Sequence, residues 1–293
     1  MEQVVTFGNS GKTLYGVLHL PEPGGSRPHG GLGVLLLHAG RQARRGPHNL
    51  YVKVARALCR AGFPVFRYDN RGYGDSEGPE TVGVADWIAD AHRALAFFRD
   101  AGGVDRVIVW GLCAGSVMAV HCAAEAPSAA DSLFLCNLIY KTNVGTGIGF
   151  RSVYGKLLTI AFWREFLTAS PLYYLKKGVP NVLRRLRAVL FPTAQEDEFG
   201  KASHRYIRAL PERLAAAGCP TCFLFSTADP LVGRPLEELF GNPVWQRALA
   251  KVSTELSLLD GADHNFSSLE FEAAAIDRTV AWALQRAAAR AAA

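Results

Sequence analysis

Three residue types that together can break an acyl bond occur far apart in the chain, in the order Cys113, Asp229 and His264. A cysteine thiolate can attack a carbonyl carbon, an imidazole can accept and return the proton, and a carboxylate can hold the imidazole in the required tautomer. Each residue follows, within a few positions, a short apolar segment that indicates a strand. Type, order and placement predict a catalytic triad of Cys113, His264 and Asp229. Asp229 could instead form a turn or a helix cap, and Asp263 is a rival acid, although neighbours in sequence rarely face each other.

Cys113 is the central residue of the motif Gly-Leu-Cys-Ala-Gly at residues 111–115. An apolar segment at 107–110 precedes the motif, and a helix-forming segment at 116–125 follows it. This arrangement predicts a nucleophile elbow, in which the glycines permit a sharp turn that leaves the nucleophile strained and accessible. The positive end of the helix would also favour the thiolate. A buried core thiol is the alternative, but such a residue does not require two flanking glycines.

Acyl transfer also needs two hydrogen-bond donors for the developing oxyanion. The backbone N–H of Ala114 is the first candidate, because it directly follows the nucleophile. The second donor is expected from the loop after an apolar strand at 32–37, at Gly40 or Arg41. His38 is expected to support this loop by hydrogen bonding rather than to act as a base.

Five residues are candidates for contact with the substrate. They are Gln42, His48, Phe162, Trp163 and Tyr173. Gln42 could add a side-chain donor to the oxyanion hole. His48 could instead cap a helix, and the three aromatic residues could instead pack in a core.

The elements that must position these residues alternate along most of the chain. Apolar segments predict strands at 4–7, 13–20, 32–37, 64–68, 106–110, 132–136, 221–226 and 255–259. Amphipathic or alanine-rich segments predict helices at 50–61, 84–99, 116–125, 204–216, 236–251 and 269–287. The first two strands form an antiparallel pair, and the remaining alternation implies a mostly parallel sheet with helices on both faces. Sites in such sheets lie at the carboxyl ends of the strands, where the three triad candidates fall.

The alternation stops in a segment at about 140–211, where aromatic helices are predicted at 154–167, 171–177 and 182–190. We expect one α/β domain spanning residues 1–293, with this segment inserted as a helical lid. Residues 141–190 contain nine lysines and arginines and one acid, Glu165. That charge indicates either a solvated helical surface or attraction of an anionic partner.

Composition and sequence patterns exclude several classes of protein. The chain has 293 residues, 49% of them apolar, and a net charge of +6, and no apolar segment approaches the roughly 20 residues of a membrane span. No secretory signal or nucleic-acid-binding motif is present, so we expect neither secretion nor a nucleic-acid partner. Six scattered cysteines favour a reducing cytoplasm over a disulfide framework. Cys219 and Cys222 have the spacing of a metal-binding pair but no second pair, so they are interpreted as small apolar residues of a strand, and neither a metal nor a cofactor is expected.

Six short motifs are spread over nearly the whole chain. They are Leu-His-Leu-Pro at 18–21, Gly-Phe-Pro-Val-Phe-Arg-Tyr-Asp at 62–69, Arg-Gly-Tyr-Gly-Asp-Ser-Glu-Gly at 71–78, Trp-Gly-Leu-Cys at 110–113, Ala-Phe-Trp-Arg at 161–164 and Ala-Asp-His at 262–264. With them the chain resembles the α/β-hydrolase superfamily and, more narrowly, the exosortase A system-associated hydrolase 1 group of bacterial proteins. The resemblance implies an α/β-hydrolase fold with a lid, hydrolase activity, a cysteine at the elbow and a loop of the type seen at Gln42, Arg44, Gly46 and His48. The chain departs from the group at residues 114–116, where an acidic residue followed by small ones is expected.

A cysteine nucleophile narrows the substrate class. With an alkyl ester, the tetrahedral intermediate would expel the thiolate more easily than the alkoxide, whereas a thioester offers two comparable leaving groups. We therefore expect an acyl hydrolase that acts on thioesters of coenzyme A or of an acidic carrier protein. An acyltransferase or cyclising thioesterase, which passes the acyl group to an amine or alcohol, is the alternative. A catalytically inactive binding module on the same fold is a third hypothesis.

Overall fold

The computed structural model describes residues 1–21, 29–38, 42–79, 83–140, 204–232 and 236–292. The chain divides into two compact units, one of Met1–Tyr140 with Tyr206–Ala293 and the other of Lys141–Arg205. The account below concerns the first unit. The predicted lid helices at 154–167, 171–177 and 182–190 lie outside the described residues, so the lid at about 140–211 stays a prediction.

The first unit is built on an eight-stranded sheet with the order β1-β2-β4-β3-β5-β6-β7-β8. The strands are β1 Glu2–Asn9, β2 Lys12–His19, β3 Leu32–Leu37, β4 Val65–Tyr68, β5 Arg106–Leu112, β6 Ala130–Cys136, β7 Thr221–Ser226 and β8 Thr254–Leu259. Strand β2 pairs antiparallel with both β1 and β4, and all other pairs are parallel. The mostly parallel sheet predicted from the alternating segments is therefore confirmed.

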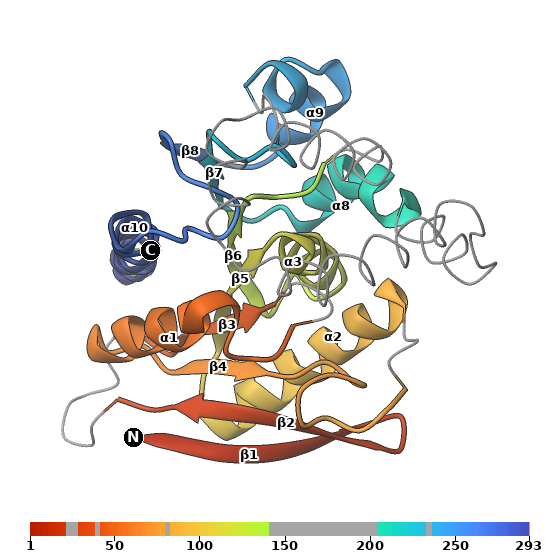
Figure 1. Ribbon diagram of the computed structural model, residues 1–293, viewed down its shortest axis with the longest axis vertical. Coiled ribbons are helices and arrows are strands. Elements are labelled where there is room, and N and C mark those ends of the chain that lie inside the picture. Colours follow the sequence, from red (N-terminus) through yellow and green to blue (C-terminus); the bar gives the residue numbers. More distant parts are fainter. Residues whose placement is uncertain (22–28, 39–41, 80–82, 141–203, 233–235, 293) are drawn as a thin grey trace, which may run out of the picture. The chain divides into compact units, whose positions relative to one another are not determined.

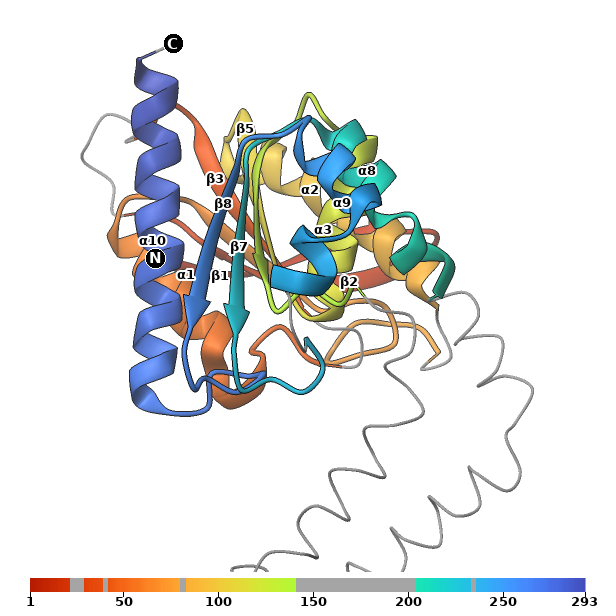
Figure 2. The ribbon, with the colours of Figure 1, turned by 90° about the horizontal axis from the view of Figure 1, so that it is seen from above.

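Helices cover both faces of this sheet. They are α1 Leu50–Arg60, α2 Val84–Gly102, α3 Ala114–Glu125, α8 Leu210–Ala217, α9 Pro243–Leu249 and α10 Leu269–Ala291. Figures 1 and 2 show α1 and α10 on one face and α2, α3, α8 and α9 on the other. Because both faces are covered, all residues of β3, β6 and β7 are buried, as is every residue of β5 after Arg106.

One predicted helix, at 236–251, is wrong as a continuous element. A π-helical turn, Leu236–Phe240, is separated from α9 by Gly241 and Asn242. Pro243 has no backbone N–H to continue the preceding turn, but it fits the first position of a new helix. The Asn242 side chain accepts a hydrogen bond from the N–H of Val244 at 2.9 Å and so caps α9.

The core ties the helices to the sheet at Trp110 of β5. The Trp110 indole ring packs edge-on against Tyr51 of α1, with ring centroids 5.3 Å apart. Its N–H donates to Thr279 Oγ1 of α10 at 3.2 Å, so this buried polar group is satisfied. The strand that carries Cys113 is thereby fixed to both helices of one face.

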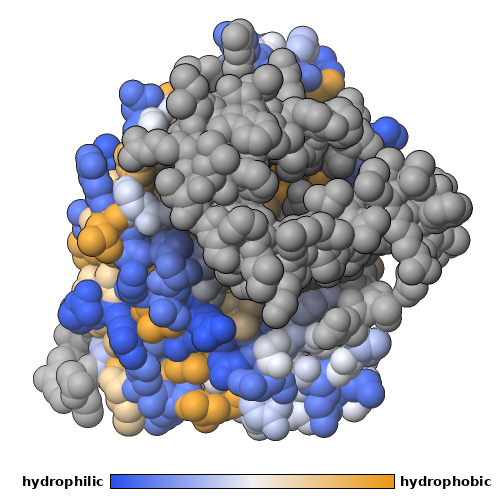
Figure 3. All heavy atoms as spheres, in the orientation of Figure 1, coloured by the Kyte–Doolittle hydropathy of each residue, from blue (hydrophilic) through white to orange (hydrophobic). Residues whose placement is uncertain are grey.

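On the face shown in Figure 3, hydrophilic residues of the described part of the chain surround smaller hydrophobic areas. None of the described helices combines the length and the hydrophobicity needed to cross a bilayer.

Candidate active site

The site is assembled at the carboxyl ends of three parallel strands. Cys113 directly follows β5, Asp229 lies three residues after β7, and His264 lies five residues after β8. Strands β5 to β8 are neighbours in the sheet, so their ends meet at one edge. The three residues proposed from the sequence as a triad are therefore brought together by the topology of the sheet.

Cys113 occupies a strained turn. Its backbone has φ 60° and ψ −121°, a conformation that non-glycine residues rarely adopt. A Cβ atom on Gly111 would lie 2.4 Å from the carbonyl group of Gly115, and one on Gly115 would lie 2.1 Å from the Leu37 carbonyl oxygen. Both glycines are required because the backbone passes this close to itself and to the end of β3.

The neighbourhood of Cys113 fixes its backbone while leaving the residue partly exposed. The Cys113 N–H donates to the Cys136 carbonyl oxygen at 3.0 Å. The hydroxyl of Ser116 lies within hydrogen-bonding distance of the carbonyl oxygens of Gly111 (2.7 Å) and Cys136 (2.9 Å). Ala114, the predicted oxyanion donor, is the first residue of α3 and lies where helical N–H groups have no partner within the helix.

Four other cysteines of the chain are buried. Burial raises the pKa of Cys122 and of Cys222 to about 12, and that of Cys219 to about 11. The thiols of Cys219 and Cys222 are buried at β7, as expected of small apolar residues in a strand. Among the described residues, no group of three or more His, Cys, Asp or Glu side chains is arranged to hold a metal ion.

His264 and Asp229 form a hydrogen-bonded pair. His264 Nδ1 lies 2.5 Å from Asp229 Oδ2, and the other Asp229 oxygen accepts a hydrogen bond from the N–H of Leu231 at 2.8 Å. The ring also interacts electrostatically with the Cys113 side chain. With Nδ1 directed at Asp229, the opposite edge of the imidazole is available for proton transfer to and from the thiol.

The electrostatics of this pair favour the imidazolium. Burial, the largest single effect, lowers the His264 pKa, but the hydrogen bond to Asp229 and the interaction with Cys113, together with attraction to their charges, outweigh it. The His264 pKa therefore rises from 6.5 to about 10. An imidazolium beside Cys113 stabilises a thiolate, the form of cysteine that attacks carbonyl carbons.

Asp263, the rival acid, has a different partner. Its two carboxylate oxygens accept hydrogen bonds from the N–H of Ser267 at 2.7 Å and from the Ser267 hydroxyl at 2.6 Å. Burial raises the Asp263 pKa, and the hydrogen bonds from Ser267 outweigh that effect and lower it. Asp263 therefore stabilises the turn after His264, and Asp229 is the carboxylate that the ring faces.

The loop after β3 is only partly described, and the predicted oxyanion residues Gly40 and Arg41 lie outside the described residues. Its described part is anchored by Arg44, whose N–H donates to Asp69 Oδ1 at 2.5 Å. The Arg44 guanidinium pairs with Asp69 and, at 2.7 Å, with Asp75. This fully buried Asp69 carboxylate joins the loop after β3 to the loop after β4.

His38, at the start of the same loop, is buried, and its Nε2 accepts a hydrogen bond from the N–H of Asn70 at 3.3 Å. This contact agrees with a supporting role. Gln42 is half-buried, and its Oε1 has no hydrogen-bond partner among the described residues. The predicted contact of Gln42 with substrate stays a prediction.

His48 contacts protein groups through both ring nitrogens: Nδ1 lies 2.7 Å from Glu272 Oε2, and Nε2 lies 2.8 Å from the carbonyl oxygen of Asn265. Its predicted contact with substrate stays a prediction, as do those of Phe162, Trp163 and Tyr173, which lie outside the described residues.

Sequence reasoning missed Asn137. The Asn137 amide nitrogen lies 2.8 Å from the His264 carbonyl oxygen and 3.0 Å from Ser226 Oγ, and its Oδ1 accepts the N–H of Ser226 at 2.8 Å. It directly follows β6, between the strands that carry Cys113 and Asp229. A polar residue at the end of a central strand was the signal that could have identified it.

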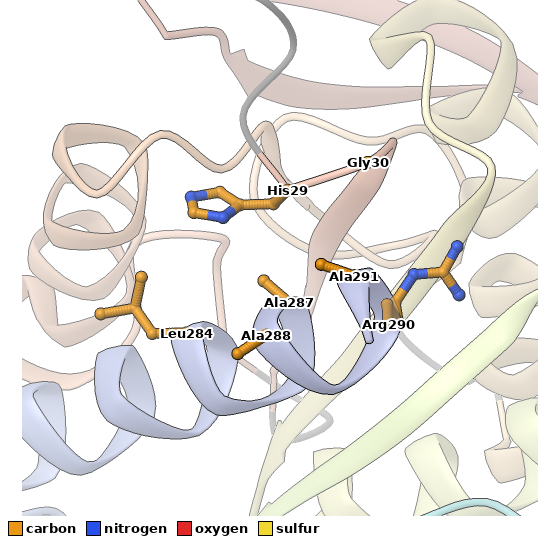
Figure 4. A pocket seen from close by; sticks show the side chains of 7 residues that line it. All are labelled: His29, Gly30, Leu284, Ala287, Ala288, Arg290 and Ala291. Atoms are coloured by element: carbon orange, nitrogen blue, oxygen red, sulfur yellow. The ribbon is translucent and has the colours of Figure 1, made fainter. Parts of the chain in front are cut away.

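A separate cavity of about 400 Å³ lies at the opposite end of the strands from Cys113, next to the start of β3. Figure 4 shows its lining residues, which are His29, Gly30, Leu284, Ala287, Ala288, Arg290 and Ala291. Because strand β3 runs from this cavity toward the edge that holds Cys113, the cavity is not part of the candidate site.

Comparison with known proteins gives one partial relative among curated sequences. Lysophosphatidylserine lipase ABHD12 of Xenopus tropicalis is 32% identical over 108 residues, which are 35% of this chain and 26% of that protein. The chain thus matches about a quarter of the length of that relative.

Solved structures resemble the whole chain at low sequence identity. Est1E from Butyrivibrio proteoclasticus with bound ferulic acid shares 12% identity over 97% of this chain and 99% of its own, with a TM-score of 0.65. Proline iminopeptidase of Mycobacterium smegmatis shares 16% over 98% and 100%, with a TM-score of 0.60. A thioesterase domain from the curacin biosynthetic pathway shares 16% over 98% and 99%, with a TM-score of 0.56. These likenesses show a common fold.

The family comparison agrees with them. A sequence model described as the alpha/beta hydrolase fold matches residues 28–206, more than half of the chain. The predicted α/β-hydrolase fold is confirmed, and the chain belongs to the α/β-hydrolase fold family.

Proposed function

We propose that the protein is a cysteine-nucleophile acyl hydrolase that cleaves acyl thioesters through a covalent acyl-Cys113 intermediate. The observation that carries this proposal is the arrangement of Cys113, His264 and Asp229. A partly exposed thiol sits on a strained elbow, beside an imidazole whose Nδ1 lies 2.5 Å from a buried carboxylate.

In the first half-reaction, the Cys113 thiolate attacks the thioester carbonyl carbon and the carbonyl electron pair moves to oxygen. The N–H of Ala114 and a donor at Gly40 or Arg41 would stabilise this oxyanion, each donor contributing about 3 kcal/mol. When the oxyanion collapses, the carbon–sulfur bond to the leaving group breaks. The His264 imidazolium gives its proton to the departing thiolate.

In the second half-reaction, His264 is neutral and accepts a proton from water as the water attacks the acyl-Cys113 carbonyl carbon. Collapse of this intermediate expels Cys113 as a thiolate and releases the carboxylic acid, with the His264 imidazolium restored. Asp229 stays ionised throughout, holds the ring in one tautomer and stabilises its positive charge.

The nucleophile selects the substrate class. Solved structures of this fold include a monoacylglycerol lipase, a proline iminopeptidase and a thioesterase domain, so the fold alone does not distinguish among acyl substrates. With cysteine as nucleophile, an alkoxide is a poorer leaving group than the enzyme thiolate, and attack on an alkyl ester mostly reverses. A thioester releases a thiolate, which leaves about as easily as the enzyme thiolate does. The forward reaction therefore proceeds.

The positive charge of the segment at 141–190 supports the proposal that the acyl group arrives on an anionic carrier. This carrier is either coenzyme A or an acidic carrier protein. We further place the chain in the exosortase A system-associated hydrolase 1 group, on the motifs quoted above, and in the cytoplasm, where Cys113 would remain reduced. Reversing the charges of Lys176, Lys177, Arg184 and Arg185 should slow hydrolysis of the carrier-bound substrate more than that of the corresponding small free thioester. Equal effects on both substrates would contradict the carrier assignment.

The test of the reaction uses one acyl group presented as a thioester and as an alkyl ester. We expect the wild-type kcat/KM for the thioester to exceed that for the ester by about 100-fold or more, a difference of about 2.7 kcal/mol in barrier height. The variant Cys113→Ser should lose most of this preference. Equal rates on both substrates in wild type would contradict the proposal.

Acyl transfer is the second candidate, because acyl-Cys113 is itself a thioester and remains reactive toward amines and alcohols. Product analysis with competing amines and water distinguishes the two reactions. An inactive binding module would give no product with either acceptor and no acyl-enzyme.

A further inference from the structure

Two consecutive peptide carbonyls of the loop that carries His264 are held by side chains from distant parts of the chain. The Asn137 amide donates to the His264 carbonyl oxygen at 2.8 Å. His48 donates from Nε2 to the next carbonyl oxygen, that of Asn265, at 2.8 Å. These bonds cross 127 and 217 positions of sequence, so the backbone on the carboxyl side of His264 is fixed by tertiary contacts.

Both ring nitrogens of His48 contact protein groups. A carbonyl oxygen can only accept, so Nε2 must carry a proton. Nδ1 faces Glu272 Oε2 at 2.7 Å, and Lys53 Nζ lies 2.7 Å from both oxygens of the same carboxylate. Burial raises the Glu272 pKa, but hydrogen bonds from Lys53 and His48 outweigh that effect and lower it, so Glu272 is ionised and accepts. Both ring nitrogens of His48 are therefore occupied by protein groups.

The backbone around this contact is strained. His48 has φ 37°, and Phe266, which follows Asn265, has φ 55°; both lie in the left-handed region that side chains disfavour. Asn137, the donor to the other carbonyl, has φ 44°. Such conformations are unfavourable and persist only where surrounding contacts hold them. Three of them around one loop indicate that its geometry is specified rather than incidental.

His48 also joins separate parts of the proposed site. It lies in the segment after β3, the loop that is proposed to supply the second oxyanion donor, and it contacts both the His264 loop and α10. Glu272 lies in α10 and Lys53 in α1, and these two helices pack on the same face of the sheet. The His48 ring thus links the loop after β3 to the loop that carries His264.

We propose that His48 is a positioning residue, held in place by Glu272, that fixes the His264 loop and couples it to the loop after β3. This inference rests on the proposed function for its effect on turnover, but its effect on the geometry of His264 is independent of any substrate. An imidazole displaced by about 1 Å from its productive position can lower turnover by about 100-fold.

The test is proton NMR of protein labelled with nitrogen-15 in histidine, in the absence of substrate. The Nδ1 proton of His264, shared with Asp229, is identified by its loss in His264→Gln. In His48→Ala we expect this proton to exchange with solvent about tenfold faster or more, because the loop opens more often. The variant His48→Gln keeps a donor near the position of Nε2 and should largely restore slow exchange. An unchanged Nδ1 proton in His48→Ala would overturn the inference.

A matched control removes a similar bond elsewhere. His29 Nε2 lies 2.8 Å from the Ala61 carbonyl oxygen, in the part of the chain that precedes β3. The variant His29→Ala should leave the His264 Nδ1 proton unchanged. Should His48→Ala fail to fold, Glu272→Gln keeps the shape of the network and removes the carboxylate charge that faces His48 and Lys53. It should also accelerate exchange, and slow exchange in that variant would count against the inference.

Turnover gives the second readout. With an acyl thioester, His48→Ala should lower kcat by about tenfold or more with little change in KM, and His48→Gln should recover part of the loss. A change confined to KM would instead assign His48 to substrate binding. If the wild-type protein turned over no thioester, the proposed function would fail while the NMR result would still decide the role of His48.

Discussion

His264 Nδ1 lies 2.5 Å from Oδ2 of Asp229, a carboxylate that has no exposed side-chain surface. The two residues follow adjacent parallel strands, β7 and β8, that are paired along their full length from Thr221 and Thr254. The sheet therefore fixes the separation of the base from its carboxylate. The ring is in turn directed at Cys113, which follows β5 in the same sheet.

Replacing Asp229 tests which carboxylate orients the ring. In Asp229→Asn the amide cannot hold the same tautomer, so we expect kcat to fall by about 100- to 10,000-fold with a small change in KM. The matched variant is Asp263→Asn, which alters the hydrogen bonds to Ser267 and should change kcat by less than about threefold. Steady-state kinetics of both variants on one thioester decides which carboxylate orients the ring. A larger loss in Asp263→Asn would reverse the assignment.

The raised pKa of His264 predicts how stability changes in alkali. The folded-state value of about 10 exceeds the ordinary 6.5, so the native state binds this proton more tightly than the unfolded chain does. That stabilisation is complete below pH 6.5 and is lost as the pH rises toward about 10. We expect the free energy of unfolding of wild type to fall over this range relative to that of His264→Gln. Urea unfolding of both proteins across the range measures the difference, and parallel curves would contradict the prediction.

The buried pair of Arg67 and His19 predicts that stability falls as the pH is lowered. Arg67 Nε donates to His19 Nε2 at 2.9 Å, which requires that nitrogen to be unprotonated. Burial, followed by repulsion from Arg67, lowers the His19 pKa from 6.5 to about 4. Stability from this pair is present above pH 6.5 and is lost as the pH falls through about 4.

The variant His19→Gln isolates this effect, because the amide oxygen can accept from Arg67 but does not titrate. We expect wild type to lose unfolding free energy relative to His19→Gln between pH 6.5 and about 4. Acid titration of unfolding midpoints in urea measures it. A wild-type curve that stayed above that of the variant in acid by a constant amount would contradict the account.

Much of the fold could be predicted because the strands of a covered parallel sheet are continuous apolar segments, as in Leu32–Leu37 and Thr221–Ser226. The edge strand Glu2–Asn9 was predicted too short, since its ends carry exposed polar residues that look like loop. The break before Pro243 was missed although a proline inside a helical segment indicates that one helix ends and another begins.

At the site, Gly111 and Gly115 and the ends of the predicted strands identified residues that lie at the carboxyl ends of the parallel strands. Contacts such as His48 with Asn265, or Asn137 with His264, join residues more than a hundred positions apart. No local pattern encodes these pairs, because they depend on how the folded loops meet. Likewise, no local pattern encodes the ion pair between Arg44 and the buried carboxylate of Asp69.

The elbow predicts a steric requirement at Gly115. A methyl group there would lie 2.1 Å from the Leu37 carbonyl oxygen, and a backbone atom cannot move aside easily. We expect Gly115→Ala to lower the free energy of unfolding by about 1–3 kcal/mol or more and to reduce activity. In Gly8→Ala the added methyl group would meet no atom within 4 Å, so this control should change stability by less than about 0.5 kcal/mol. Similar urea midpoints for the two variants would show that the close approach at the elbow is not required.

The most direct test of the covalent mechanism is intact-protein mass spectrometry after brief exposure to a panel of acyl thioesters. We expect one acyl adduct in wild type, located on the peptide that contains Cys113, absent from Cys113→Ala and longer-lived in His264→Ala. Cys59→Ala removes another partly exposed thiol and should keep the adduct. An adduct that persisted in Cys113→Ala, or a wild-type protein that released acid without ever carrying the acyl group, would contradict a covalent role for Cys113.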